Sequence, residues 1–129
     1  MSNSPIMSIP AFSYNLLYVS DVAVSEAFYA KLLQKPAIES SPGFALFLTG
    51  PEQKLGLWKN AGVQPAATAP GGSELAFTVA NNGEVDQYYQ SWQAAGVTIA
   101  QEPTQMDFGY TFVACDPDGH RLRVFALSL

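Results

Sequence analysis

Hydrophobic residues recur at strand and helix spacing in the first half of the chain. Val24, Phe28 and Leu32 fall at every fourth position, which predicts a helix with one apolar face. Asp21 precedes this helix and can cap its N-terminus, and Lys35-Pro36 ends it. Short apolar runs punctuated by Gly and Pro predict strands on either side of the helix. These strands are residues 13–20, 37–40, 44–48 and 54–59.

The same pattern restarts after residues 61–72, a stretch rich in Ala, Pro and Gly that predicts a linker. Apolar residues then recur at helical spacing up to Gly96, a residue type common just after a helix end. These positions are Val85, Tyr88, Tyr89, Trp92 and Ala95. The predicted strands of this half are residues 74–80, 97–101, a segment around 110–115, and 122–127.

An offset of 60 residues aligns the first strand and helix of the two halves, so that Leu17 matches Phe77 and Phe28 matches Tyr88. This internal repeat predicts an α+β fold made of two βαβββ modules in tandem, each a curved mixed sheet with a helix on one face. We expect residues 1–129 to form a single domain, with module one at about 11–60 and module two at about 73–127. The concave face of each sheet would be free to bind a ligand.

Composition narrows the choice of partner. The chain of 129 residues is 48% hydrophobic and 13% charged, so it has apolar surface to bury in an oligomer interface or a pocket. Its net charge of −5 argues against nucleic acid and anionic membrane surfaces as partners. The single cysteine excludes an internal disulfide. Residues 1–10 lack the basic start of a secretory signal, so we expect a cytoplasmic protein.

The segment Asp116-Pro117-Asp118-Gly119 has strong turn chemistry and lies between two apolar runs, which predicts a β-hairpin. In its second strand, Leu122 and Val124 face one side of the sheet. Arg121, Arg123 and Phe125 face the other.

Three motifs in this order resemble the vicinal oxygen chelate superfamily, which includes glyoxalases, bleomycin resistance proteins and extradiol dioxygenases. They are Tyr18-Val19-Ser20-Asp21, Phe28-Tyr29-Ala30-Lys31-Leu32-Leu33 and Asp116-Pro117-Asp118-Gly119-His120. The resemblance covers about residues 13–127. It is specific for the fold but not for function, because the superfamily holds enzymes and drug-binding proteins. It implies a homodimer with two equivalent cup-like cavities at the interface.

Within the superfamily the chain is most similar to small antibiotic-binding resistance proteins, including those that bind phenazines. The carrying segments are Leu57-Trp58, Phe108-Gly109-Tyr110-Thr111-Phe112 and Asp116 to Val124.

The resemblance also places the family's four metal-ligand positions, which fall on Tyr14, Gly56, Glu74 and Arg123. Glycine has no side-chain donor, neutral tyrosine is a poor ligand, and arginine would repel a cation. Only Glu74 could serve, so we expect neither a catalytic metal nor another cofactor. Glu74 and Arg123, if adjacent, would form an ion pair there. The pair either only neutralises itself and orders the sheet, or Arg123 also holds a carboxylate or carbonyl of a ligand.

Strand parity then predicts an aromatic cavity suited to a flat hydrophobic ligand. Trp58 is the expected stacking residue, and simple packing is the alternative. The expected ligand-binding residues are Trp58, Arg123, Glu74, Tyr14, Tyr18 and Phe125, followed by Phe47, Met106, Phe108 and Tyr110. Tyr88, Tyr89 and Trp92 are expected in the core.

These features favour metal-independent binding and sequestration of a small, flat aromatic compound, an antibiotic or a toxic metabolite, with no catalytic residue. The alternative is a glyoxalase-like lyase or isomerase that uses Glu74 as its general base. A third alternative is a module with a vestigial pocket that acts through its dimer surface.

Overall fold

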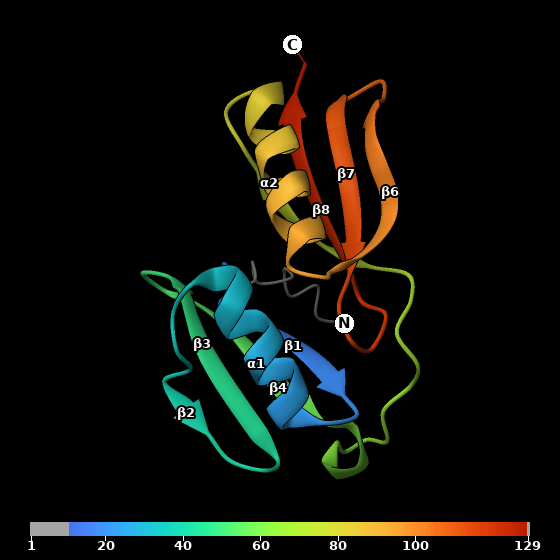
Figure 1. The fold of residues 1–129 in the computed structure, drawn as a ribbon. Coiled ribbons are helices and arrows are strands. Elements are labelled where there is room, and N and C mark those ends of the chain that lie inside the picture. Colours follow the sequence, from blue (N-terminus) through green and yellow to red (C-terminus); the bar gives the residue numbers. More distant parts are fainter. Residues whose placement is uncertain (1–10, 129) are drawn as a thin grey trace, which may run out of the picture.

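The computed structural model describes residues 11–128 and shows two modules, each with one helix and one four-stranded sheet (Figure 1). Residues 1–10, where the sequence predicts no secretory signal, lie outside the described residues. Module one consists of β1 (Tyr14–Val19), α1 (Val22–Leu33), β2 (Glu39–Ser40), β3 (Phe44–Gly50), β4 (Gln53–Lys59) and the short helix η1 (Asn60–Gly62). Module two consists of β5 (Glu74–Thr78), α2 (Asn82–Ala94), β6 (Thr98–Gln105), β7 (Gly109–Cys115) and β8 (Arg121–Leu127).

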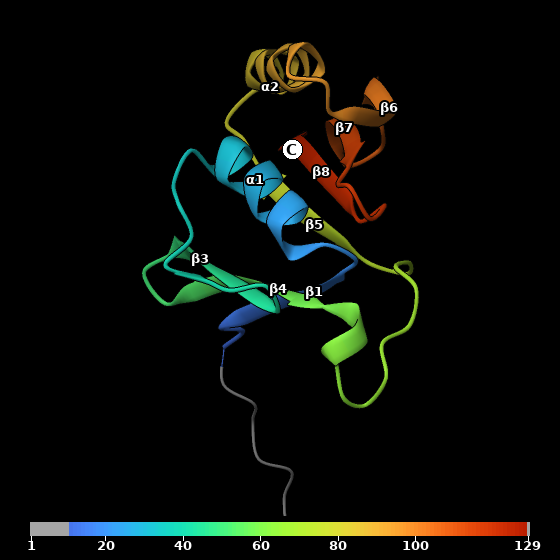
Figure 2. The same cartoon turned by 60° about the horizontal axis from the view of Figure 1, so that its bottom comes forward.

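The two sheets have the same topology, with strand orders β1-β4-β3-β2 and β5-β8-β7-β6. In each, the first strand pairs in parallel with the last, and the remaining pairs are antiparallel. A helix covers one face of each sheet, as Figures 1 and 2 show. The predicted α+β fold of tandem βαβββ modules is therefore confirmed.

Both long helices begin after a polar capping residue, which for α1 is the predicted Asp21. The Asp21 carboxylate accepts a hydrogen bond from the Val24 amide at 3.2 Å, and the Asn81 side chain accepts one from the Glu84 amide at 2.9 Å. These side chains satisfy amides that have no partner within the first helical turn. Gly96 follows the end of α2 with φ +84°, the left-handed conformation that glycine adopts without strain.

The buried stripe of α1 differs from the predicted one. Val22, Ser25 and Tyr29 are buried, whereas Val24 is 52% exposed. The stripe is rotated because α1 packs against module two as well as against its own sheet (Figure 2). On α2, Tyr88 is 46% exposed, so the expectation that it belongs to the core is wrong.

The turn at Asp116–His120 fastens module two to module one. The Tyr29 hydroxyl donates to Asp116 Oδ2 at 2.8 Å in a buried hydrogen bond, and the Ser20 amide donates to Asp118 Oδ1 at 3.0 Å. Burial and the neighbouring Asp116 carboxylate raise the pKa of Tyr29. Leu122 of β8 completes the core of module one. A residue of module two thus packs into the core of module one, while each module keeps its own hydrophobic cluster. Within residues 11–128, none of the helices has the length and apolar character needed to cross a membrane.

Candidate functional site

One face of each sheet packs against the helix of its module, and we call the opposite face the free face. The free face of the second sheet carries the polar centre of the candidate site. Along β8, Leu122 and Val124 are each 1% exposed and lie toward α2. Arg123 and Phe125 alternate with them and therefore face the other side. In the sheet, Arg123 lies opposite Ala76 of β5, so small side chains on the neighbouring strand leave space beside it.

Arg123 is the centre of a hydrogen-bond network on this free face. Its Nε donates to Glu74 Oε1 at 2.7 Å. Its Nη1 lies 3.3 Å from Thr111 Oγ1 and 3.5 Å from Gln101 Oε1, both of which accept. Three strands, β5, β6 and β7, thus each supply one acceptor to the guanidinium. The ion pair that the sequence suggests between Glu74 and Arg123 is formed.

Aromatic side chains lie beside this network. The Phe108 and Phe125 rings meet edge to face with their centroids 6.0 Å apart, and Arg123 Cζ lies 5.7 Å from the centre of the Phe108 ring. Met106 contacts the Gln101 amide, whose Nε2 lies 3.8 Å from the Met106 sulfur. The structure therefore brings four of the predicted residues of module two together: Glu74, Phe108, Arg123 and Phe125.

The free face of module one is aromatic and carries no comparable polar centre. Tyr14, Leu16 and Tyr18 project from β1 and are 51%, 46% and 37% exposed. Tyr18 lies opposite Trp58 of β4, and their rings meet edge to face at 6.3 Å. Lys54 Nζ lies 5.2 Å from the centre of the Tyr14 ring. The free faces of the two sheets therefore differ: that of the first sheet is aromatic, and that of the second carries the Arg123 guanidinium.

The family's metal positions do not fit a metal ion in this chain. Gly56 lies opposite Leu16 just as Arg123 lies opposite Ala76, so the two positions are equivalent in the repeat. A Cβ at Gly56 would meet Leu16 Cδ2 at 2.6 Å and Phe44 Cζ at 3.0 Å, so neighbouring side chains fill the space of a ligand. At the other position, the only acidic donor is paired with a permanent cation. Among residues 11–128, no group of three or more His, Cys, Asp or Glu side chains could hold a metal ion.

Two predicted site residues face the helices and not the free faces. Phe47 is 0% exposed in the core under α1, and Tyr110 packs against the core under α2. The Tyr110 hydroxyl donates to Asp86 of α2 at 2.8 Å, which raises the pKa of Tyr110. The expectation that they face the cavity is wrong because strand parity depends on the register of β3 and β7, which periodicity alone leaves open.

The residues of the free faces that were not predicted include Phe44, Leu46, Gln101 and Thr111. The sequence does indicate the position of Thr111. Counting outward along the hairpin from the 116–120 turn pairs Cys115 with Arg121 and Thr111 with Phe125, so Thr111 lies on the same face as Phe125. No comparable signal existed for Gln101, since β6 contains two register shifts.

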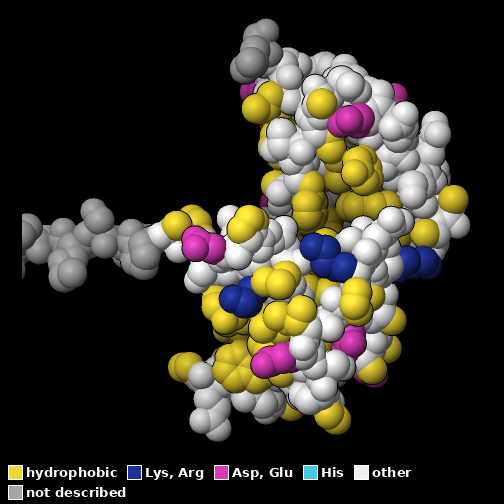
Figure 3. Space-filling view, turned by 90° about the vertical axis from the view of Figure 1, so that its left-hand side faces the viewer, with side chains coloured by type: hydrophobic (Ala, Val, Ile, Leu, Met, Phe, Trp, Pro, Cys, Tyr) yellow, Lys and Arg dark blue, Asp and Glu magenta, His cyan; other side chains and the backbone are white. Residues whose placement is uncertain are grey.

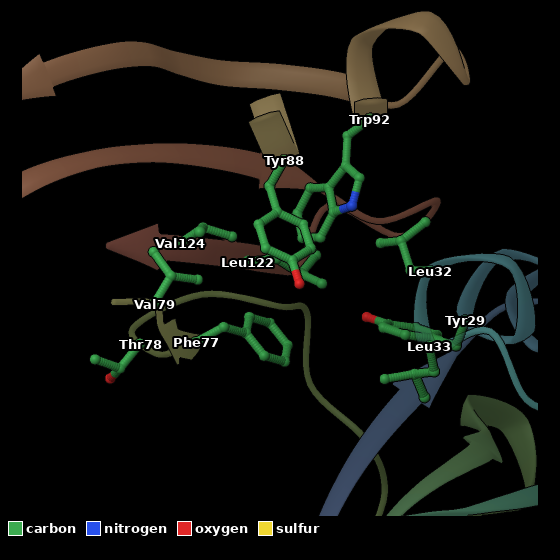
Figure 4. A pocket seen from close by; sticks show the side chains of 10 residues that line it. All are labelled: Tyr29, Leu32, Leu33, Phe77, Thr78, Val79, Tyr88, Trp92, Leu122 and Val124. Carbon is green, nitrogen blue, oxygen red and sulfur yellow. The ribbon is translucent and has the colours of Figure 1, made fainter. Parts of the chain in front are cut away.

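A separate cavity of about 320 Å³ lies between the helices, on the opposite side from the free faces (Figure 4). The side of the molecule seen in Figure 3 is hollowed between the modules, and hydrophobic side chains gather there. The residues that line the cavity between the helices are uncharged: Tyr29, Leu32, Leu33, Phe77, Thr78, Val79, Tyr88, Trp92, Leu122 and Val124. It offers apolar contact but no acid, base or metal donor, and no predicted ligand-binding residue lines it.

Comparison with known proteins agrees with the fold. The chain is 30% identical over 116 residues to the phenazine antibiotic resistance protein EhpR of Enterobacter agglomerans. The aligned region covers 88% of this chain and 89% of that protein. A protein of Agrobacterium tumefaciens solved in solution by NMR is 45% identical, with a TM-score of 0.86 over 94% of this chain and all of that one. A glyoxalase-related enzyme of Fulvimarina pelagi, 21% identical, shares the fold with a TM-score of 0.80 over 92% of this chain and 88% of that one.

Residues 11–124 match the Glyoxalase/Bleomycin resistance protein/Dioxygenase superfamily, which is the family that the sequence motifs indicate. The chain therefore belongs to this superfamily.

Proposed function

We propose that the protein binds a small, flat aromatic compound on its free faces without a metal ion, and thereby sequesters an antibiotic or a toxic metabolite. The observation that carries the proposal is the Arg123–Glu74 pair, whose atoms Nε and Oε1 lie 2.7 Å apart where metal-dependent relatives place a ligand. A guanidinium at this position makes cation binding unfavourable and leaves hydrogen bonding as the available chemistry.

The ligand class follows from the side chains around the pair. Trp58 and Tyr18 on module one, and Phe108 and Phe125 on module two, present aromatic surface. Flat aromatic molecules bind such surfaces by stacking and by the release of water. Similarity to a phenazine antibiotic resistance protein supports the same class. Phenazines are therefore the first compounds to test.

The proposed binding unit is a homodimer. Tyr14 and Leu16 are about half exposed on an apolar free face, and such a surface gains by being covered. If two copies pair so that module one of each faces module two of the other, each cavity would combine the aromatic wall with the Arg123 network. A C2 dimer would contain two such cavities.

The arrangement weighs against the enzymatic alternative. Oε1 of Glu74 accepts the Arg123 Nε–H at 2.7 Å, so a permanent cation holds one carboxylate oxygen and only Oε2 is left to meet a substrate proton. His120, the only histidine, interacts through Nε2 with the Tyr18 carbonyl at 3.1 Å in the turn between modules. Neither group is placed as a free general base.

The test is a titration of the purified chain with phenazine, a quinone and a bleomycin-type drug, followed by tryptophan fluorescence, with and without EDTA. We expect saturable phenazine binding that EDTA does not change, and a dimer by light scattering. A stoichiometric transition metal in the purified protein whose removal abolishes binding would overturn the proposal. So would fluorescence that responds to none of the compounds.

A further inference from the structure

We propose that Arg123 and Glu74 together form a subsite for a neutral hydrogen-bond acceptor, a carboxamide or a ring carbonyl, on the aromatic ligand, and that this subsite disfavours a ligand carboxylate. The inference rests on the proposed function and names the ligand's substituent. It follows from three features of the network: a donor without a partner among residues 11–128, a fixed orientation and a cancelled charge.

The first feature is that one amino group of Arg123, Nη2, has no partner among residues 11–128. A guanidinium has five N–H donors on three nitrogens. Nε is used by Glu74, and Nη1 by Thr111 and Gln101. Nη2 donates to none of residues 11–128, and none of their buried side-chain nitrogens or oxygens lacks a partner. Nη2 is therefore open to solvent on the free face, where a ligand atom can replace water.

The second feature is that the guanidinium is held in one orientation before any ligand binds. Thr111 is 0% exposed, and its hydroxyl donates to the Val124 carbonyl at 2.9 Å. Its oxygen therefore presents a lone pair to Nη1 of Arg123 at 3.3 Å. The Glu74 carboxylate holds the guanidinium at Nε. A donor held in this way loses little freedom on binding, so its hydrogen bond adds to affinity and to directional selectivity.

The third feature is that the charge of Arg123 is already balanced. A ligand carboxylate at Nη2 would share one cation with Glu74, and the two anions would repel each other across a few ångströms in a partly desolvated site. A neutral carbonyl oxygen accepts the same hydrogen bond without this repulsion. The comparison favours the neutral acceptor because Coulomb attraction and repulsion at similar distances nearly cancel.

Arg121 is the other charged residue on this face of β8. It lies opposite Glu74 in the strand register, is exposed, and borders the Asp116–His120 turn and the glycines of the linker. Its charge is screened by solvent. Phe108 and Phe125 lie toward the other end of the strand. A ring stacked there would direct its substituent to Arg123 and away from Arg121.

The experiment compares phenazine, a phenazine carboxamide and the carboxylate with the same substitution position, by calorimetry at neutral pH. The proteins are the full chain, Glu74→Gln, and Glu52→Gln as a control that removes one negative charge from the exposed β3–β4 turn. For the native chain we expect the carboxamide to bind roughly tenfold more tightly than the carboxylate. In Glu74→Gln, the carboxylate should gain roughly tenfold and the carboxamide should change little.

The outcomes separate this inference from the proposed function. If phenazine binds but the carboxylate equals or exceeds the carboxamide on the native chain, the subsite inference is wrong and the proposed function stands. If Glu74→Gln and Glu52→Gln change the carboxylate affinity equally, the effect is general electrostatics and the subsite inference is also wrong. If none of the three compounds binds the folded native chain, the subsite inference fails, and the proposed function fails as well if the quinone and the bleomycin-type drug do not bind either.

Discussion

Arg123 and Glu74 lie on adjacent parallel strands, two residues apart in the register, and share a hydrogen bond of 2.7 Å between Nε and Oε1. Their side chains are 17% and 33% exposed, so the pair is partly shielded but not buried. An ion pair of this exposure adds little to stability. Its consequence is chemical, because it presents an oriented donor group at a position where the family resemblance places a metal ligand.

Replacing Arg123 with Met tests whether the guanidinium serves the ligand or only the sheet. Met keeps the apolar stem and removes the donors, so the free energy of unfolding should fall by less than about 1 kcal/mol, as for exposed ion pairs. Affinity for a carbonyl-bearing phenazine should fall by roughly tenfold, the value of one good hydrogen bond. Calorimetry measures the affinity and a urea titration measures the stability. Unchanged binding in a folded Arg123→Met variant would assign Arg123 a purely structural role.

The chain has two tryptophans, and only Trp58 lies on a free face, whereas Trp92 packs against Phe112 in the core of module two. The variant Trp92→Phe keeps Trp58 as its single tryptophan. If phenazine stacks on Trp58, it should quench the fluorescence of this variant strongly. In Trp58→Phe the quenching should be much weaker. We expect Trp58→Ala to reduce affinity by about tenfold or more, since stacking on aromatic side chains is worth roughly 1 kcal/mol or above. Equal quenching in both Phe variants would exclude Trp58 as the stacking residue.

Tyr29 joins the modules through its hydrogen bond to Asp116, and Tyr29→Phe removes only the hydroxyl. The loss should be about 1.5–3 kcal/mol, the usual value when one partner is charged. A lower urea midpoint with an unchanged slope would show this effect. A variant as stable as the native chain would mean that the hydrogen bond does not fasten the modules.

The same residue predicts a dependence on alkaline pH. Because burial raises the folded-state pKa of Tyr29 above its ordinary 10.0, the unfolded chain ionises first. The contribution of Tyr29 to stability is complete below the ordinary tyrosine pKa of 10.0 and declines as the pH rises above that value. The slope should approach about 1.4 kcal/mol per pH unit. Urea titrations at several alkaline pH values should show a shallower decline for Tyr29→Phe than for the native chain.

Gly109 allows the closest backbone approach of module two. A Cβ there would lie 2.0 Å from the Ala126 carbonyl oxygen, and φ is +153°. Because the obstacle is backbone in the adjacent strand, Gly109→Ala should destabilise the chain by roughly 3 kcal/mol or more. Gly43→Ala is the matched control, since its Cβ would meet nothing within 4 Å. A melting temperature that falls equally in both variants would contradict this explanation.

Local chemistry determined the elements and their order. Helical spacing, the caps at Asp21 and Asn81 and the turn at 116–119 are readable because each depends on residues a few positions apart. The internal repeat then indicated two equivalent modules, and hairpin parity correctly placed Arg123 and Phe125 on one face. The ion pair with Glu74 could be anticipated because the family resemblance places both residues at metal-ligand positions.

Only the tertiary structure decided which face of each strand is buried when the register was ambiguous. Phe47 and Tyr110 read as cavity residues but face the helices, because a shift of one position moves a side chain through the sheet. Gln101 joins the Arg123 network through β6, whose pairing with β7 contains two register shifts that the sequence does not indicate. Contacts between strands far apart in sequence depend on register and packing, which no local pattern encodes.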